Sequence, residues 1–317
     1  MTLFTLVGEK PPVLRSTDFL SEDHPNRTYP GRARTSAMIR ALVFLAIYGV
    51  AMITWTVADF MLAEDRGDND ALYALVQMTS AIVAYLVLVV VMEARARPYE
   101  IQPSRIFGLV KGMILGTAII TACIGILALL GSYSIIGTNQ DYSPWLDLLL
   151  LGVAAGVNEE IQMRGVLFRL VEEGLGTLGA VGISALVFGL MHLSNSSVTA
   201  WGTIAIALEA GILLAAVYVL TRSLWWCIGL HFAWNVVEGP VFGSAVSASA
   251  RDNSWLISSW SGPEILTGGG FGLEASIVLV ILSGGLGVAL LAYAWRRGLM
   301  VAPMWTRKRT PTAVLLG

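Results

Sequence analysis

The chain has 317 residues, of which 56% are hydrophobic and only 13% are charged, and its mean hydropathy is +0.71. A soluble domain is typically about 45–50% apolar and about 25% charged. This composition therefore excludes a disordered chain and a disulfide scaffold, and it indicates that lipid is the solvent. The net charge of −2 excludes a basic field that would attract nucleic acid.

Apolar stretches follow one another along most of the chain. Residues 1–36 are polar and rich in proline, which predicts a cytoplasmic tail. A helix needs about 20 apolar residues to cross a bilayer, and eight stretches come close to that length. They are residues 37–62, 71–92, 109–131, 145–163, 178–193, 201–220, 224–242 and 273–295. The expected fold is an all-α, polytopic membrane helix bundle of about eight transmembrane helices.

The basic residues predict the orientation. If the N-terminus is cytoplasmic, all lysines and arginines except Arg66 and Arg251 fall on cytoplasmic segments, as the positive-inside rule requires. We therefore expect both termini in the cytoplasm. The expected organisation is one membrane domain over residues 37–298, with an outer connection at 243–272 and a basic cytoplasmic tail at 299–317.

Ionisable residues inside the apolar stretches are candidates for function, because a charge in a bilayer is unfavourable. Glu159, Glu160 and Arg164 end the fourth stretch. Glu160 and Arg164 are four residues apart, so they can form an ion pair on one helix face. Glu159 points about 100° away from Glu160 around the helix, which leaves Glu159 free for chemistry.

Two of the three histidines also lie in apolar stretches. His192 follows Phe188 by four residues, and Asn235 follows His231 by four, so each pair shares a helix face. The sequence midpoint of Glu159 and His192 falls on the glycine turn near Gly176. Two straight antiparallel helices joined there would bring Glu159 and His192 to the same depth, and the polar tip between them, with Arg164 and Arg169, is expected to project into the cytoplasm.

Three motifs in this order resemble those of the CPBP family, which comprises CAAX prenyl endopeptidases of the Ras-converting type and bacterial Abi-type bacteriocin-processing proteases. The motifs are Glu-Glu-x-x-x-Arg at Glu159, Glu160 and Arg164, Phe-x-x-x-His at Phe188 and His192, and His-x-x-x-Asn at His231 and Asn235. Each motif is weak alone, but the set is specific. It covers about residues 145–245.

The resemblance implies a metal-independent intramembrane glutamic protease without a cofactor. Glu159 would be the general base, and His192 would position and activate the water. His231 and Asn235 would line the oxyanion side, with Glu160, Arg164 and Phe188 in support. The implied partners are the lipid bilayer and a membrane-associated peptide or lipidated, CAAX-like protein. The implied location is a prokaryotic cytoplasmic membrane, in which the chain is a multi-pass protein.

Other interpretations stay open. Glu159, His192 and His231 would suit a zinc site with two histidines and one glutamate, although no His-Glu-x-x-His motif is present. The same fold would also suit a non-catalytic immunity or scaffolding protein, and buried carboxylates would suit a proton-coupled transporter. The cysteines, Cys123 and Cys227, lie in apolar runs and are expected to fill the core.

Further carboxylates accompany the motif set. Glu209 lies in the middle of an apolar stretch, where a structural hydrogen bond is expected. Asp147 and Glu274 lie near the ends of stretches and are expected to be solvated. The pattern gives no role to Glu238.

Overall fold

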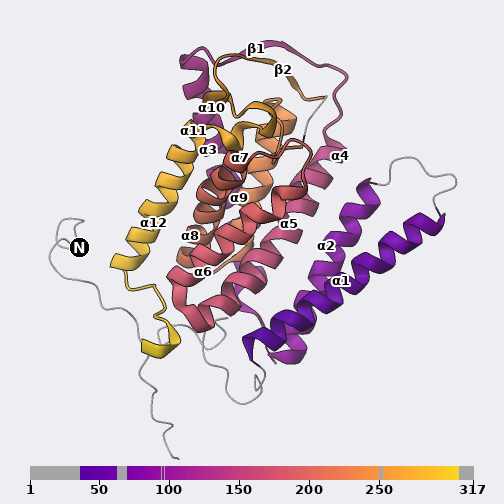
Figure 1. Cartoon of the computed structure of the whole chain (residues 1–317), viewed down its shortest axis with the longest axis vertical. Coiled ribbons are helices and arrows are strands. Elements are labelled where there is room, and N and C mark those ends of the chain that lie inside the picture. The colour runs from indigo at the N-terminus through magenta and orange to yellow at the C-terminus, as the bar shows by residue number, and fades with distance from the viewer. Residues whose placement is uncertain (1–35, 63–69, 94, 96, 250–252, 307–317) are drawn as a thin grey trace, which may run out of the picture.

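The computed structural model describes residues 36–62, 70–93, 95, 97–249 and 253–306. The tails expected at 1–36 and 299–317 therefore lie largely outside the described residues. The described part is a bundle of long helices with one small two-stranded sheet at its upper end (Figure 1). The all-α membrane bundle expected from the apolar stretches is confirmed at this level.

The α-helices follow the apolar stretches closely. They are α1 (Ala37–Leu62), α2 (Asp70–Leu86), α3 (Phe107–Leu129), α4 (Trp145–Asp147), α5 (Ala155–Glu160), α6 (Arg169–Met191), α7 (Ala200–Ile206), α8 (Ile212–Thr221), α9 (Leu224–Val236), α10 (Glu264–Thr267), α11 (Ile277–Leu279) and α12 (Gly285–Arg296). Wider π-helical stretches continue several of them, at η3 (Val87–Met92), η6 (Leu148–Ala154), η7 (Ile161–Phe168), η9 (Ala207–Gly211), η10 (Val237–Val241) and η13 (Val280–Gly284).

Six helical segments of the described chain are long and apolar enough to cross a membrane. They are Ala37–Met61, Ala71–Met92, Pro103–Leu129, Trp145–Ser194, Ala200–Thr221 and Ile277–Arg296. The segment Trp145–Ser194 contains two of the expected spans, and the expected span 224–242 is helical but is not among the six. The count of eight spans and the cytoplasmic placement of both termini stay predictions, although the described chain begins and ends at the same end of the bundle (Figure 1).

The turn expected near Gly176 lies inside the segment labelled α6. Gly176 has a φ of 74° and a ψ of 177°, outside the helical region. A Cβ atom at this position would lie 2.6 Å from the Val301 carbonyl oxygen, so the turn needs glycine for its conformation and for space. The chain reverses here, which lets the helix with Glu159 run beside the helix with His192.

Helices α3 and α9 pack closely through glycines. A Cβ at Gly112 would lie 2.2 Å from the Trp226 carbonyl oxygen, and a Cβ at Gly229 would lie 2.0 Å from the Leu109 carbonyl oxygen. Small residues let membrane helices approach at backbone distance. This contact fixes the position of α9, which carries His231 and Asn235.

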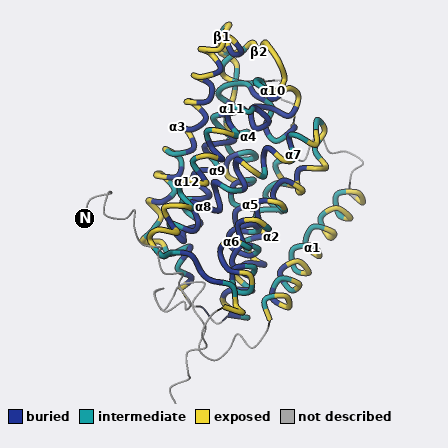
Figure 2. The backbone as a smooth tube through the Cα atoms, turned by 60° about the vertical axis from the view of Figure 1, so that its left-hand side comes forward, coloured by how far each residue is buried: buried dark blue, intermediate teal, exposed yellow. Residues whose placement is uncertain are grey.

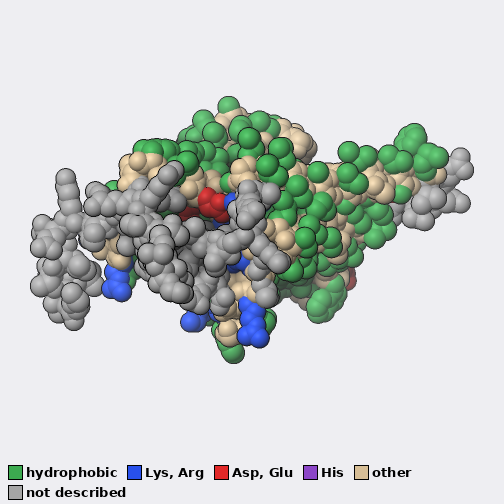
Figure 3. All heavy atoms as spheres, turned by 90° about the horizontal axis from the view of Figure 1, so that it is seen from below, with side chains coloured by type: hydrophobic (Ala, Val, Ile, Leu, Met, Phe, Trp, Pro, Cys, Tyr) green, Lys and Arg blue, Asp and Glu red, His purple; other side chains and the backbone are tan. Residues whose placement is uncertain are grey.

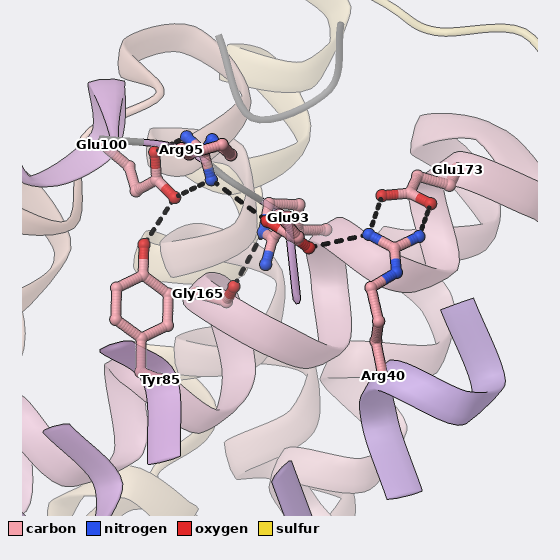
Figure 4. A network of polar contacts seen from close by, with 8 residues as sticks. Arg40, Tyr85, Glu93, Arg95, Glu100, Gly165 and Glu173 are labelled. Atoms are coloured by element: carbon pink, nitrogen blue, oxygen red, sulfur yellow. Dashed lines mark hydrogen bonds and ion pairs between the residues drawn. The ribbon is translucent and has the colours of Figure 1, made fainter. Parts of the chain in front are cut away.

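Helix α1 lies at the edge of the bundle and is much less buried than the central helices (Figure 2). A buried ion network attaches its lower end (Figure 4). Arg40 of α1 contacts Glu93 at 2.7 Å and also binds Glu173. Arg169 contacts Glu93 at 2.6 Å, and Arg95 contacts Glu100 at 2.5 Å.

The polar tip is packed more closely than its sequence suggests. Arg164 and Arg169 are fully buried, and the projection of the tip into the cytoplasm stays a prediction. Arg164 pairs with Glu160 one turn away, whereas Glu93, the partner of Arg169, comes from a distant segment. At the lower end of the bundle, Lys, Arg and carboxylate side chains show on the end face while hydrophobic side chains cover the flanks (Figure 3).

The upper end of the bundle carries the two-stranded sheet. Strand β1 (Tyr133–Thr138) pairs antiparallel with β2 (Leu256–Trp260), with Tyr133 opposite Trp260. The Tyr133 and Trp260 rings meet edge to face, with their centroids 4.8 Å apart. The connection between α9 and β2 folds beneath this sheet, over the site described next.

Candidate active site

One polar cavity collects the residues of all three motifs. Its volume is about 400 Å³. The residues that line it are Tyr48, Gln77, Leu151, Ala155, Asn158, Glu159, Gln162, Met191, His192, Asn195, His231, Asn235, Val246, Ser247 and Ser249. Glu159, His192, His231 and Asn235, which were expected to form a site, therefore face a common space.

The two adjacent glutamates have different surroundings, as their angular separation on the helix predicts. The Glu160 side chain is fully buried, and its Oε1 lies 2.8 Å from Arg164 Nη1. This is the ion pair expected from the spacing of four residues. The Glu159 side chain is 20% exposed and lines the cavity, and its Oε2 has no hydrogen-bond partner among the described residues. Glu159 is thus the carboxylate that can meet a water molecule.

His231 lies between the two glutamates. Its Nδ1 donates to Glu160 Oε1 at 2.9 Å, and its Nε2 lies 3.9 Å from Glu159 Oε2. An ionised carboxylate can only accept a hydrogen bond, so Nδ1 of His231 is the donor. This bond to Glu160 fixes the orientation of the His231 ring.

His192 begins a short 3₁₀ turn, η8 (His192–Ser194), directly after α6. Its Nδ1 lies 2.7 Å from the Phe188 carbonyl oxygen. Because a carbonyl only accepts, Nδ1 carries the proton and Nε2 is left for another partner. The Phe188 ring packs edge to face on both His192 and His231, with centroids 5.0 Å and 6.0 Å away. The Arg164 guanidinium lies 5.1 Å from the centre of the same ring.

Asn235 is buried one turn beyond His231. Its Nδ2 donates to the Leu151 carbonyl oxygen at 3.0 Å. An amide nitrogen carries two protons, so this bond orients the amide and leaves one N–H for another acceptor.

An apolar groove of about 580 Å³ lies beside the polar cavity, between α1 and the helices that follow Glu160. Phe44 and Leu45 line it on the α1 side, and Met163 and Val187 line it on the other. Gln162 and Met191 line both the groove and the polar cavity. The polar and apolar spaces are therefore neighbours.

Two expectations about the other carboxylates were wrong. Glu274 is buried rather than solvated, and its oxygens contact Ser247. Glu209 is fully buried, and neither of its oxygens has a hydrogen-bond partner within the described structure. Asp147 is partly buried and accepts from the Tyr142 hydroxyl at 2.5 Å. The two cysteines are buried, as expected.

Several cavity residues were not singled out from the sequence. Tyr48 and Gln77 come from the first two helices. A polar side chain within each apolar stretch was the sequence feature that could have identified them as cavity residues. Ser247 and Ser249 belong to a connection without periodicity, which gave no signal. The Tyr48 hydroxyl contacts Asn158 Oδ1 at 3.3 Å and so links α1 to the cavity.

The zinc alternative has little geometric support. Within the described residues, no group of three or more histidine, cysteine, aspartate or glutamate side chains is arranged to hold a metal ion. The Nδ1 atoms of His192 and His231 contact the Phe188 carbonyl oxygen and Glu160, an arrangement that metal-binding histidines also show, so these contacts do not decide between the two mechanisms. The absence of a metal requirement stays a prediction.

Comparison with known proteins gives one match. Residues 141–237 match the family described as type II CAAX prenyl endopeptidase Rce1-like. A search of curated proteins found no match to the chain. The matched region contains every motif residue described above, from Glu159 to Asn235.

Proposed function

We propose, from the match of residues 141–237 to the type II CAAX prenyl endopeptidase Rce1-like family, that this chain is an intramembrane endopeptidase that uses Glu159 to activate water. The family implies a membrane peptidase, and the apolar helices fit an integral membrane protein. The observation that carries the proposal is the convergence of Glu159, His192, His231 and Asn235 on one cavity.

The proposed reaction begins with a water molecule held between Glu159 and His192. Glu159 takes one proton from the water as the water oxygen adds to the peptide carbonyl carbon. No covalent enzyme intermediate is involved.

The negative charge that develops on the carbonyl oxygen needs donors on the opposite side. The second N–H of Asn235 is available for this, and a protonated His231 Nε2 would supply another donor. The carbon–nitrogen bond then breaks, and the amine leaving group receives the proton that Glu159 holds. The products are a new carboxylate and a new amine.

The apolar groove supports a substrate with a lipid anchor. The groove shares Gln162 and Met191 with the cavity, so a lipid chain in the groove would deliver the attached peptide to Glu159. The fit is chemical, because an apolar chain that leaves the bilayer needs an apolar surface. We propose a lipidated peptide as the substrate and the cytoplasmic side of the membrane as the place of cleavage.

The test is cleavage of a quenched fluorescent peptide that carries an S-farnesyl cysteine, by the purified full-length protein in lipid nanodiscs. Glu159→Gln and His192→Ala should each lower kcat/KM by at least about a hundredfold, in line with the loss of a general base or its partner. Glu264→Gln, in the exposed helix α10, is the matched control and should retain activity. Normal activity of both cavity variants would contradict the proposal.

The same assay separates the alternatives. A non-catalytic immunity or scaffolding protein would cleave no peptide, yet Glu159→Gln would still support its biological function. A zinc enzyme would lose activity with a chelator and regain it with zinc. The glutamate mechanism predicts activity that a chelator leaves unchanged.

A further inference from the structure

The boundary between the apolar groove and the polar cavity is built around Asn158. Gln162 lines both spaces, and its Nε2 donates to Asn158 Oδ1 at 3.0 Å. The Tyr48 hydroxyl donates to the same oxygen at 3.3 Å. A carbonyl oxygen has two lone pairs, so these two bonds occupy Asn158 Oδ1 and fix the rotation of its amide group.

Both donors are attached to the groove. Gln162 is part of the groove lining, and Tyr48 stacks on Phe44, which also lines the groove, with the ring centroids 6.1 Å apart and the planes 4° apart. Tyr48 belongs to α1, whereas Asn158 and Gln162 lie four residues apart on the helix formed by α5 and η7. Asn158 is therefore held where an apolar chain in the groove would join a peptide in the cavity.

Asn158 differs from the other amide side chains that line the cavity, which are Gln77, Gln162, Asn195 and Asn235. The amide nitrogens of Gln162, Asn195 and Asn235 each donate to an oxygen of the protein. Within the described residues no hydrogen bond orients Gln77, whereas the oxygen of Asn158 accepts twice and its nitrogen has no partner.

Asn158 thus presents N–H groups of fixed direction to a molecule in the cavity. Its side chain lines the cavity but the residue is only 8% exposed. A bound substrate that displaced water and left these donors unpaired would be disfavoured, because an unsatisfied buried donor is costly. A substrate that offers an acceptor at this point would be favoured.

The main chain of a peptide offers carbonyl oxygens as acceptors. In a substrate that is cleaved directly after its lipid-bearing residue, that residue stands at the junction and directs its own carbonyl towards Glu159. His231 and Asn235 are the proposed donors to this carbonyl, which is the one under attack. The carbonyl of the preceding residue lies on the other side of the lipid-bearing residue and is the acceptor left for Asn158.

We propose that Asn158 binds the main-chain carbonyl oxygen of the residue that precedes the lipid-bearing residue, and that Tyr48 and Gln162 are positioning residues for this bond. The proposal rests on the proposed peptidase function and adds a substrate-binding residue outside the three motifs. The bond sets the register of the peptide, because it determines which carbonyl carbon reaches the water at Glu159. It contacts main chain only, so it tolerates any side chain on the preceding residue.

A sulfur substitution in the substrate tests the bond. Two S-farnesyl peptides have the same sequence, but one carries a thioamide in place of the carbonyl of the preceding residue, because sulfur accepts hydrogen bonds weakly. The purified full-length protein in nanodiscs should cleave the thioamide peptide with a kcat/KM at least about fivefold lower. Cleavage is followed by chromatography of the products.

The variant Asn158→Leu removes the donor while keeping the size of the side chain. It should cleave the all-oxygen peptide at least about fivefold more slowly, as expected for the loss of one hydrogen bond. It should discriminate less than about twofold between the two peptides, because the group that senses the sulfur is gone. A thioamide three residues further from the lipid is the control and should be cleaved like the all-oxygen peptide by both proteins.

Variants of the positioning residues leave Asn158 in place. Tyr48→Phe and Gln162→Met each remove one donor to Asn158 Oδ1, and each should lower the discrimination between the two peptides at least about twofold. Tyr293→Phe, at an exposed position on α12, is the matched control and should discriminate like the wild type. Full discrimination in both Tyr48→Phe and Gln162→Met would contradict their positioning role.

The outcomes separate this inference from the peptidase function. Cleavage of both peptides at the same rate by the wild type, or an equal thioamide effect in the wild type and Asn158→Leu, would overturn the role of Asn158 and leave the peptidase function intact. Failure to cleave any of the peptides would overturn both proposals. If Asn158→Leu does not fold, the comparison of Tyr48→Phe with Tyr293→Phe decides.

Discussion

Glu160 holds two groups of the site at once, Arg164 at 2.8 Å and His231 at 2.9 Å. Glu160→Ala should lower the free energy of unfolding by about 3–5 kcal/mol, because it strands a buried guanidinium. The double variant Glu160→Leu and Arg164→Met removes both charges and should recover most of that stability. It should not recover activity, because His231 loses the acceptor that fixes its ring.

Thermal unfolding of the purified protein and the peptide assay measure the two effects separately. Equal stability of the single and double variants would mean that Arg164 is not held mainly by Glu160. Arg164 Nη2 also donates to the Gly211 carbonyl oxygen at 3.2 Å, so a partial recovery is the expected result.

Glu100 gives the protein a pH-dependent stability. Its burial opposes ionisation, but the Arg95 guanidinium, 2.5 Å away, holds the pKa of this carboxyl below its ordinary value of 4.5. The stabilisation is therefore present above pH 4.5 and is lost as the pH falls below 4.5 towards the lowered folded pKa. Glu100→Gln should be less stable than the wild type at pH 7 by about 3 kcal/mol.

The difference in Tm between the wild type and Glu100→Gln should shrink as the pH is lowered through this range. Glu264→Gln, at an exposed position, serves as the control and should follow the wild type at every pH. A constant difference between wild type and Glu100→Gln would show that the ionised form of Glu100 is not the stabilising one.

Residue-level prediction from sequence succeeded where the contact is local. The Glu160–Arg164 pair follows from a spacing of four on a helix. The contact of Glu274 with Ser247 spans 27 residues of a connection without periodicity, so spacing carries no information about it. The same reason explains why Arg169 and its distant partner Glu93 were not matched.

At the scale of elements, the close contact of α3 and α9 positions half of the site. Gly112→Ala should destabilise the protein by about 3 kcal/mol and lower kcat/KM, because the added methyl meets backbone atoms that cannot move aside. Gly125→Ala lies on the same helix with open space around it and should be neutral or stabilising by up to about 1 kcal/mol. Unfolding in detergent and the peptide assay compare the two variants.

An equal loss of activity in Gly112→Ala and Gly125→Ala would contradict this account, because Gly112 faces α9 and Gly125 does not. The glycines Gly108, Gly112 and Gly116 recur every four residues, a pattern typical of close helix pairs in membranes. That signal was present in the sequence but does not say which helix is the partner. The turn at Gly176 was easier to predict from the sequence, because glycines and polar residues lie next to it in the chain.

For the whole molecule, the basic residues predict that the lower end of the bundle faces the cytoplasm. Arg297→Cys, at the end of α12, should react with a membrane-impermeant maleimide only after the membrane is opened, whereas Ser134→Cys, on β1, should react from outside. The native cysteines are both buried and should contribute little background. The reverse labelling pattern would invert the orientation.

The composition was sufficient to predict a helical membrane protein, because 56% hydrophobic residues leave few alternatives. It was not sufficient to predict how the helices close around the cavity. The cavity residues at 246–249 and the ion network around Glu93 depend on contacts between segments that are far apart in the chain.

Membrane insertion is the stage of biosynthesis at which a lone charge is most unfavourable. Glu160 and Arg164 lie one turn apart, so they neutralise each other as soon as their own helix forms, before α9 has been synthesised. Arg169 pairs with Glu93, which precedes it by 76 residues. In both pairs the ribosome completes the carboxylate first, so Arg164 and Arg169 enter a bilayer that already contains their counter-ions.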